Sequence, residues 1–484
     1  MRELFSLIAG RLQACWPAYL RIQMPITLPQ NLMVSVSGVR GRVGNPLTPE
    51  LMAQIAAAFG AFMKTEGAGG PIYVGRDSRV SGPMFSRAVI SGLQSVGARV
   101  VDLGKVPTPT LMLAVEQAEA SGGIVITASH NPADWNALKL VTAEGVFLGK
   151  EQSEHFHQFL NQEDVQRASW DLIEPVIEDG EAWQRHLSGI LALPEVDVEA
   201  IKRRGIRVAL DCVNGVGGPA LAELLSELGC TVEAIGMNPD GRFPRDPEPT
   251  AANLTELCKL VQDTGSEVGF AIDPDADRLS LVDETGRALG EDLTLALAAS
   301  VVLVRNPGPV VTNLSTSQVL DDVADSFSVP LTRAPVGEIN VAQQMMIEGA
   351  VVGGEGNGGV ILPALHHTRD APLAAALILQ ALIDVGGPLS VAAARWPSYA
   401  IVKEKIRFPR EALPQAYEIL ESDLDDATVD RADGLRLSWR DRSTWLHLRP
   451  SGTEPVVRLI VEAPDEGRAK ALVDHVLGLL EGVG

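Results

Sequence analysis

The chain has 484 residues, of which 46% are hydrophobic and 21% are charged, and its formal net charge is −22. This length is too great for a single hydrophobic core and predicts three or four domains of ordinary globular composition. The negative charge argues against nonspecific binding to nucleic acid or to an anionic membrane surface, and no apolar run reaches the ~18 residues that span a bilayer.

The first 30 residues contain a short apolar stretch that Arg11 interrupts, without the small-residue cleavage site of a signal peptide. We interpret residues 1–30 as an N-terminal extension. The four cysteines show no paired spacing, which is typical of reduced thiols in a cytosolic protein. These features predict a cytoplasmic location.

From residue 31 onward, strand-like and helix-like segments alternate. Short β-branched runs occur at 71–79, 98–104 and 122–129, and helical spacing marks 47–64 and 81–96. Two further sets of strand-like segments follow, at 207–215, 230–236, 268–277 and 279–286, and then at 309–315, 329–337, 350–356 and 358–363. This alternation favours mostly parallel sheets with helices on both faces.

The C-terminal part has a different pattern. Strand-like segments follow one another closely after residue 400, with helices near 410–424 and 466–481, which indicates a smaller domain. We therefore predict an α/β protein with three similar α/β domains of mixed, mostly parallel sheets and a C-terminal α+β domain. The predicted boundaries are 31–195 for domain I, 196–302 for domain II, 303–398 for domain III and 399–484 for domain IV.

Each predicted domain contains one loop with residues suited to chemistry. In domain I, a strand leads into TASHNP (127–132), which exposes the Ser129 hydroxyl at the carboxyl end of the strand, where α/β folds bind ligands. The adjacent His130 does not indicate a hydrolase, because neighbouring side chains rarely face each other and the GxSxG pattern is absent. Taken alone, this loop also fits an ordinary turn.

In domain II, DPDADR places Asp273, Asp275 and Asp277 at alternate positions directly after a strand. Three carboxylates on one short loop need a compensating cation, and hard oxygen ligands favour Mg²⁺ or Ca²⁺. An EF-hand is disfavoured because Arg278 occupies the position of its required glycine. A phosphatase with Asp273 as nucleophile would leave Asp277 and Arg278 without a role, and a solvated acidic turn is the plainest alternative.

Domains III and IV contribute a glycine-rich loop and a donor-rich turn. In GGEGNGG (353–359), glycines let the backbone approach a ligand closely, and Glu355 and Asn357 offer groups suited to sugar hydroxyls. In RPSGTEPVVR (449–458), Arg449 joins hydroxyl and backbone donors suited to phosphate. The segment GVGGPA (215–220) matches a dinucleotide fingerprint, but we interpret it as a helix-start turn.

In this order, the four loops resemble those of the α-D-phosphohexomutase superfamily, which includes phosphoglucosamine mutases, phosphomannomutases and phosphoglucomutases. The resemblance extends from about residue 34 to the end and includes SGVRG (37–41), VGRDSRVSG (74–82), VPTPTL (106–111) and NALK (136–139). It implies four domains around a central cleft. The implied enzyme is an isomerase that interconverts hexose 6-phosphate and hexose 1-phosphate through a phosphoserine and a hexose 1,6-bisphosphate.

The resemblance also implies roles for individual residues. Ser129 would carry the phosphoryl group and complete a Mg²⁺ site with Asp273, Asp275 and Asp277. The transferring phosphoryl group would be surrounded by Arg40, His130, Lys139 and Arg278. The sugar hydroxyls would be held by Glu355 and Asn357. The distal phosphate would be bound by Arg449, Ser451, Gly452, Thr453 and Arg458.

The sequence departs from the family pattern in the sugar loop. Many members have a serine where this chain has Asn357 and a histidine where it has Gly359, so Lys139 and Arg40 become the better acid/base candidates, with His366 or His367 as substitutes. The GEGNGG form is most similar to phosphoglucosamine mutases, and phosphomannomutase or phosphoglucomutase activity is the alternative.

More remote alternatives are a metal-dependent sugar phosphatase and a sugar-phosphate-binding protein without turnover. We expect a small-molecule sugar phosphate as partner, hexose 1,6-bisphosphate as activator, and a monomer or homodimer that binds neither nucleic acid nor membrane.

Overall fold

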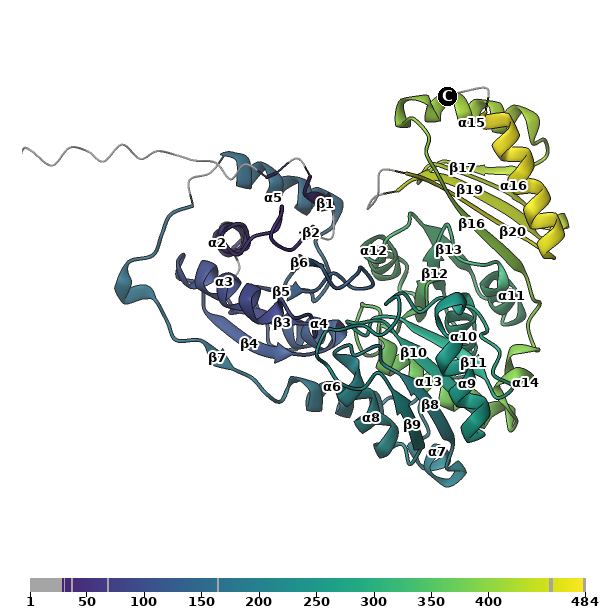
Figure 1. Ribbon diagram of the computed structural model, residues 1–484, viewed down its shortest axis with the longest axis horizontal. Helices are drawn as coiled ribbons and strands as arrows, with labels where there is room; N and C mark the ends of the chain where they lie inside the picture. Colours follow the sequence, from purple (N-terminus) through teal and green to yellow (C-terminus); the bar gives the residue numbers. More distant parts are fainter. Residues whose placement is uncertain are drawn as a thin grey trace, which may run out of the picture.

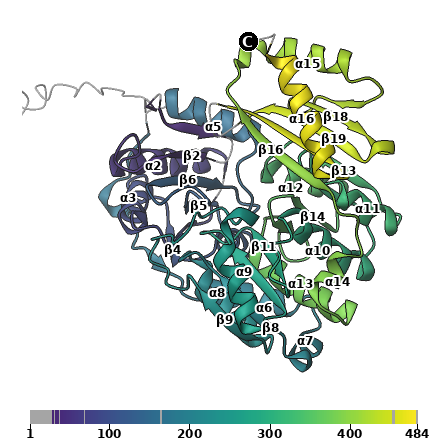
Figure 2. The ribbon, with the colours of Figure 1, turned by 45° about the vertical axis from the view of Figure 1, so that its right-hand side comes forward.

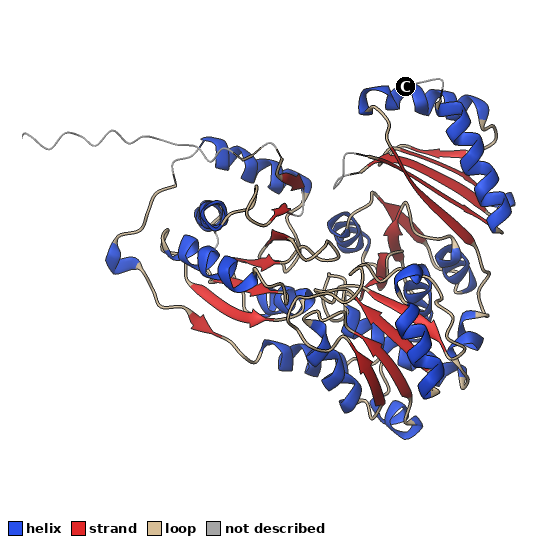
Figure 3. Cartoon of the chain, in the orientation of Figure 1, coloured by secondary structure: helices blue, strands red, loops and turns tan. Residues whose placement is uncertain are grey.

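The computed structural model describes residues 28–29, 31–35, 38–67, 69–162, 165–451 and 456–481. Four units follow one another in an arc, from the purple N-terminal domain through teal and green to the yellow C-terminal domain (Figures 1 and 2). Helices cover the sheets of the first three units, and the last unit is built on an antiparallel sheet (Figure 3). The predicted fold class is confirmed, and the predicted extension lies outside the described residues except for 28–29.

Domains II and III share one four-stranded topology. In each, three parallel strands are followed by a fourth, antiparallel strand at the edge, so the spatial order is fourth, third, first, second. The strands of domain II are β8 (Arg207–Asp211), β9 (Thr231–Ile235), β10 (Val268–Ile272) and β11 (Leu279–Asp283). The strands of domain III are β12 (Val310–Asn313), β13 (Leu331–Ala334), β14 (Val352–Glu355) and β15 (Gly359–Ile361).

Domain I contains the same unit with additions. Its four strands, in the order β6-β5-β3-β4, are β3 (Ile72–Arg76), β4 (Val100–Lys105), β5 (Gly122–Ile126) and β6 (Trp135–Val141). The sheet is extended by β1 (Met33–Ser35), β2 (Gly38–Arg42) and β7 (Ile177–Glu178). Its helices are α2 (Pro49–Thr65), α3 (Gly82–Gln94), α4 (Thr108–Gln117) and α5 (Lys150–Gln162).

Domain IV has five strands, and every neighbouring pair is antiparallel. They are β16 (Ala400–Ile406), β17 (Thr428–Asp430), β18 (Leu435–Trp439), β19 (Thr444–Pro450) and β20 (Val457–Ala463). The helices α15 (Leu413–Asp423) and α16 (Glu466–Leu480) pack on this sheet around a hydrophobic core that contains only domain IV residues. This domain is therefore a separate packing unit.

Domains II and III, in contrast, share a single hydrophobic core. Helix α13 (Ala371–Val385) lies in its middle, and its first twelve residues are all buried, which explains why its sequence APLAAALILQAL is apolar on every face. The remaining helices that pack in this body are α6 (Ala182–Leu191), which falls within the predicted limits of domain I but packs on this shared core, α7 (Val198–Arg204), α8 (Gly217–Glu227), α9 (Thr255–Thr264), α10 (Asp292–Arg305), α11 (Val319–Ser326), α12 (Glu338–Glu348) and α14 (Leu389–Ala393). Separating the two domains would expose this core, so they form one body.

A buried polar cluster joins domain I to this body. The Asp370 carboxylate lies between His186 and His366, whose Nε2 atoms are 2.7 and 2.8 Å from the same oxygen, Oδ2. Thr110 of α4 contacts the other nitrogen of His186 at 2.9 Å. These three ligand-type side chains could hold a metal, but hydrogen-bond separations onto a single oxygen indicate two imidazoles that donate to one carboxylate. Although burial opposes ionisation, the two histidines hold the pKa of Asp370 far below its usual value.

We predict that Asp370→Asn lowers the free energy of unfolding by about 2–3 kcal/mol at pH 7, because two hydrogen bonds to a buried charge are lost. Asparagine keeps the oxygen that caps α13 by accepting from the Leu373 amide, so the substitution tests the histidine contacts alone. Urea unfolding followed by circular dichroism measures the change, with Asp263→Asn on the exposed face of α9 as control. Equal stability of the Asp370→Asn and parent proteins would contradict this account.

Candidate active site

Three of the predicted loops occupy the same place in the repeated topology. Residues 127–134 connect β5 to β6, residues 273–278 connect β10 to β11, and residues 356–358 connect β14 to β15. Each loop therefore leaves the carboxyl end of a third strand and returns as the antiparallel fourth strand. We call them the serine loop, the metal loop and the sugar loop, and we count Glu355 and Gly359, at its two ends, as part of the sugar loop.

The serine loop holds Ser129 in a strained backbone conformation with a φ of 48°. The Thr127 hydroxyl accepts from the Ser129 amide at 2.9 Å, and the Ser129 hydroxyl donates to Asp273 Oδ2 at 2.8 Å. His130 Nδ1 lies 3.3 Å from the same hydroxyl. Ser129 is only 3% exposed, so the nucleophile candidate of domain I is directed at the carboxylates of domain II.

Arg79 builds this loop, and the sequence analysis gave it no role. Its guanidinium is fully buried, pairs with Asp77 at 2.9 Å, and donates to four backbone carbonyls of the serine loop region. These carbonyls belong to Ser129, Asn131, Pro132 and Trp135, at 2.6–3.0 Å. Every sequence has backbone carbonyls, so the acceptors of Arg79 cannot be recognised from residue types. The only sequence signal for the role of Asp77 and Arg79 was their place in the motif VGRDSRVSG.

The metal loop brings together its three predicted ligands, all completely buried, with ligand atoms within 4.8 Å of one another. Asp275 Oδ1 and Asp277 Oδ1 have no hydrogen-bond partner in the described part of the chain. Buried carboxylate oxygens without partners fit a hard divalent cation such as Mg²⁺. Burial and the neighbouring Asp277 and Asp275 raise the pKa of Asp273 well above its usual value.

Two predicted cations lie against these carboxylates. Lys139 Nζ donates to Asp275 Oδ2 at 2.9 Å and lies 4.0 Å from Asp277 Oδ2. Although burial opposes ionisation of Asp275, Lys139 holds its pKa well below the usual value. Arg278 Nε lies 3.7 Å from Asp277 Oδ1. The structure therefore places both residues beside the triad, as the proposed phosphoryl site requires.

Arg40 and His130 lie near these two cations. Arg40 Nη1 donates to Asn131 Oδ1 at 2.6 Å, and burial lowers the pKa of Arg40 to about 10. Burial, together with the Arg278 and Arg40 charges, lowers the pKa of His130 well below its usual value. Glu248, which the sequence analysis did not single out, lies 3.5 Å from Arg278 Nη1 and 4.0 Å from His130 Nε2.

The sugar loop packs against the metal loop through its backbone. The Leu279 amide, directly after the metal loop, donates to the Gly358 carbonyl at 2.9 Å. Gly358 has a φ of +87°, and a Cβ atom there would lie 2.4 Å from the Leu279 carbonyl oxygen, so only glycine fits. Glu355 accepts from Asn313 at 2.8 Å, from the Gly337 amide at 3.1 Å and from Asn357 at 3.3 Å.

Arg369 is a second site residue that the sequence analysis missed. It is 6% exposed and joins the metal and sugar loops, with Nη2 2.5 Å from Asp277 Oδ2 and Nη1 2.6 Å from Glu355 Oε2. His366, named above as an acid/base substitute, instead belongs to the buried cluster around Asp370. The side chain that lies against Gly359 is that of Arg369, which follows His367 by two residues in the sequence.

The predicted phosphate-binding turn of domain IV is linked to the sugar loop by Asp433. Arg449 Nε lies 2.7 Å from Asp433 Oδ2, which also accepts from the Val336 amide at 3.1 Å. Val336 directly precedes Gly337, whose amide is bound to Glu355. Ser451 is buried, and Arg458 on β20 lies opposite Arg449 on β19 in the antiparallel strand register. The predicted ligands Gly452 and Thr453 lie outside the described residues.

The glycine-rich segment at 215–220 has a packing role. A Cβ atom at Gly215 would lie 2.7 Å from Pro274 Cα, and one at Gly217 would lie 2.7 Å from Ala276 Cβ. The Val216 amide also donates to the Pro274 carbonyl at 2.9 Å. The metal loop therefore fills the space in front of these glycines, which agrees with the helix-start interpretation.

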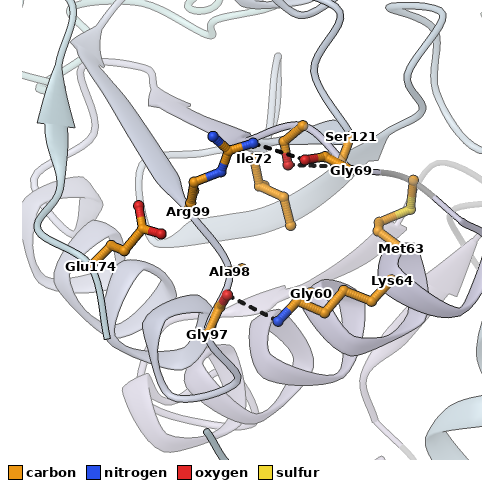
Figure 4. Close-up of a pocket in the computed structure, with 11 residues that line it drawn as sticks. Gly60, Met63, Lys64, Gly69, Ile72, Gly97, Ala98, Arg99, Ser121 and Glu174 are labelled. Carbon is orange, nitrogen blue, oxygen red and sulfur yellow. Dashed lines mark hydrogen bonds between the residues drawn. The ribbon is translucent and has the colours of Figure 1, made fainter. Parts of the chain in front are cut away.

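A cavity of about 220 Å³ lies apart from the four loops, between α2 and residues 97–99, which precede β4 of domain I (Figure 4). Its Lys64 ammonium donates to the Val96 and Gly97 carbonyls at 2.6 and 2.9 Å, and Arg99 donates to the Gly69 carbonyl at 2.8 Å. The two cations that line it are thus engaged with backbone carbonyls, and the predicted site residues gather elsewhere. No helix in the described ranges is both long and apolar enough to cross a membrane.

Repeated α/β domains with a serine, an acidic triad and a glycine-rich loop at equivalent positions agree with the phosphohexomutase class that the sequence resembles. Models of the four phosphoglucomutase/phosphomannomutase domains, the α/β/α domains I, II and III and the C-terminal domain, match residues 32–167, 184–286, 290–399 and 404–479. The chain belongs to the phosphoglucomutase/phosphomannomutase family.

Individual relatives agree. A probable phosphoglucosamine mutase of Methanopyrus kandleri is 39% identical over 448 residues, which cover 92% of this chain and 96% of that protein. A phosphoglucomutase/phosphomannomutase of Thermococcus kodakarensis is 38% identical over 459 residues, covering 92% and 97%. The crystal structure of a phosphoglucomutase/phosphomannomutase family protein from Burkholderia thailandensis superposes with a TM-score of 0.83 at 26% identity, covering 94% and 98%.

Asp292, at the start of α10, packs against Gly356 of the sugar loop. Its Oδ1 accepts from the Ser317 amide at 2.8 Å, and a Cβ atom at Gly356 would lie 2.0 Å from the same oxygen. Burial raises the pKa of Asp292 to about 7, and nearby Glu462 and Glu291 add to this rise although Lys403 opposes it. In the folded protein the Asp292 carboxyl therefore keeps its proton up to about pH 7, whereas an ordinary carboxyl releases it below about pH 5.

We predict that Asp292→Asn raises the melting temperature at pH 8 by more than it does at pH 5. Because the folded pKa lies above that of the unfolded chain, the contribution of Asp292 is fully present at low pH and is lost as the pH rises through about 7. Asparagine cannot ionise and still offers an oxygen to Ser317. Calorimetric melts at both pH values test this, and an equal gain at the two would refute it.

Proposed function

We propose that the chain interconverts hexose 6-phosphate and hexose 1-phosphate through a phosphoserine at Ser129. The main support is the 2.8 Å contact between the Ser129 hydroxyl and Asp273, which brings a nucleophile from one domain to the acidic triad of the next. In phosphoryl transfer the protein mainly positions the reactants and neutralises charge. The buried arginine, lysine and aspartate side chains of this site suit that task.

In the proposed cycle, a hydroxyl oxygen of the substrate bonds to the phosphorus on Ser129 Oγ while the bond from phosphorus to Oγ breaks. The hydroxyl proton passes to Ser129 Oγ by way of Lys139 or Arg40, the two acid/base candidates. The product of this step is a hexose 1,6-bisphosphate, which reorients within the site so that its other phosphoryl group faces Ser129. Its other phosphoryl group then returns to Ser129, with the proton transfer reversed.

Mg²⁺ would be held by Ser129 together with Asp273, Asp275 and Asp277, and when bound it neutralises charge on the transferring oxygens. The cations Lys139, Arg40 and Arg278, together with the uncharged His130 imidazole, would surround the transferring phosphoryl group, since they lie beside the triad and Ser129. Asn357 and Glu355 would orient the sugar. The distal phosphate would be bound by Arg449, Ser451, Gly452, Thr453 and Arg458.

A phosphatase that uses Asp273 as nucleophile has less support. Asp273 Oδ2 accepts from Ser129, and Oδ1 accepts from the Asp277 and Arg278 amides at 3.1 and 3.3 Å. Both oxygens are therefore engaged, whereas the serine hydroxyl has a single strong partner. These contacts favour serine as the phosphoryl acceptor.

We predict that Ser129→Ala lowers mutase turnover at least about 1,000-fold, because the covalent route is removed. Mass spectrometry of the parent protein after incubation with a hexose 1,6-bisphosphate should locate one phosphoryl group on Ser129. Ser153→Ala, at another buried serine in α5, should keep parental activity. Full turnover of Ser129→Ala, or a phosphate on Asp273, would refute the mechanism.

For the substrate we propose glucosamine phosphate, because the GEGNGG loop and the similarity to a probable phosphoglucosamine mutase point to it. A coupled assay should compare the 6-phosphates of glucosamine, mannose and glucose, each with Mg²⁺ and the matching bisphosphate. We expect kcat/KM for glucosamine 6-phosphate to exceed the others at least about tenfold. A higher value for either other sugar would replace this assignment while leaving the mutase chemistry intact.

A further inference from the structure

Arg369 lies between three carboxylates from three separate segments. Its contacts are Asp277 of the metal loop at 2.5 Å, Glu355 of the sugar loop at 2.6 Å, and Glu338 at the start of α12, whose Oε2 is 3.2 Å from Nε. The guanidinium is planar and rigid, so fixing two of these contacts also fixes the third. Among the described residues, none of those proposed to surround the phosphoryl group forms an ion pair with both Asp277 and Glu355.

Gly359 provides the space for this side chain. A Cβ atom at position 359 would lie 2.2 Å from Arg369 Cδ and 2.8 Å from Cγ. A larger residue at 359 and an arginine at 369 therefore exclude each other. The glycine of the sugar loop and the arginine before α13 form one structural unit.

Arg369 and Lys139 act on the triad in parallel ways. Lys139 holds Asp275 by Oδ2, and Arg369 holds Asp277 by Oδ2, while the Oδ1 atom of each aspartate has no hydrogen-bond partner among the described residues. Each cation thus fixes one oxygen of a carboxylate and leaves the other for a metal. Groups that orient metal ligands in this manner commonly change metal affinity about 10–100-fold when they are removed.

We propose that Arg369 is a positioning residue that sets the orientation of Asp277 in the metal site and couples it to Glu355 of the sugar loop. The inference rests on the proposed function for its catalytic meaning, but it concerns metal binding in the absence of substrate. Through Arg369, a displacement of Glu355 reaches Asp277. Metal affinity and the geometry of the sugar loop are therefore linked by one side chain.

The charge of Arg369 complicates a simple deletion, because removing a cation near the triad also favours a divalent metal. Arg369→Lys separates the two effects. Lysine keeps the positive charge, but its single ammonium lacks the planar fork that holds Asp277 and Glu355 together. A loss of metal affinity in this variant therefore reports on orientation.

The experiment titrates dephosphorylated protein with Mn²⁺ by calorimetry, without sugar. We expect Arg369→Lys to bind Mn²⁺ about tenfold more weakly than the parent. Arg305→Lys, which alters an ion pair with Asp384 on the surface of the same body, should bind normally. Folding of each variant is checked by its melting temperature, and parental affinity in a folded Arg369→Lys protein would overturn the proposal.

A double-mutant cycle tests the coupling separately. Glu355→Gln should change Mn²⁺ affinity by a different factor in the parent than in Arg369→Lys, with a discrepancy of at least about threefold. Equal factors in the two backgrounds would refute the link to the sugar loop. Because no turnover is measured, a failure here is distinct from a failure of the mutase assignment, which the Ser129 experiments address.

Discussion

Three buried carboxylates on one six-residue loop are the constraint on which this architecture depends. Asp273, Asp275 and Asp277 cannot remain ionised in the interior without cations or strong donors, since the cost of an unpaired buried charge is several kcal/mol. Besides Arg278 and the backbone amides of the loop itself, their partners come from outside domain II: Ser129 and Lys139 from domain I, and Arg369 from the segment before α13. The same charges that suit a metal therefore also bring the neighbouring domains to the loop.

The repeated topology explains how one loop can recruit both neighbours. In each of the first three domains, the connection from the third to the fourth strand carries the chemistry: Ser129, the acidic triad, or the loop that follows Glu355. Equivalent loops at the carboxyl ends of strands are where α/β sheets place ligands. The same topological position thus holds a different set of polar residues in each domain, and the arrangement of the domains brings these residues together.

The sequence predicted most strands of the three α/β units, the helices at 47–64, 81–96, 410–424 and 466–481, and the four loops, because hydrophobic periodicity and turn residues are local signals. It could not reveal Arg79 or Arg369. Arg79 acts on backbone carbonyls, which leave no trace in residue type, and Arg369 joins carboxylates 92 and 14 residues away in the chain. Asp433 was missed for the same reason, since its partners, Arg449 and the Val336 amide, meet only after domain IV is placed. The absent side chain at Gly359 was the single local hint of Arg369.

Domain IV is attached to domain III in a different way from that in which domains II and III are joined to each other. Domains II and III share a core, so their separation would expose apolar surface. Domain IV has its own core and meets domain III through polar contacts, which include Ser315 with His447 at 2.8 Å and the Gln318 amide with Glu462 at 2.9 Å. Water can replace such hydrogen bonds at small net cost. The predicted phosphate-binding turn is thus attached to the sugar loop by hydrogen bonds through Asp433, whereas Asp277, Arg369 and Glu355 all belong to the body that domains II and III form.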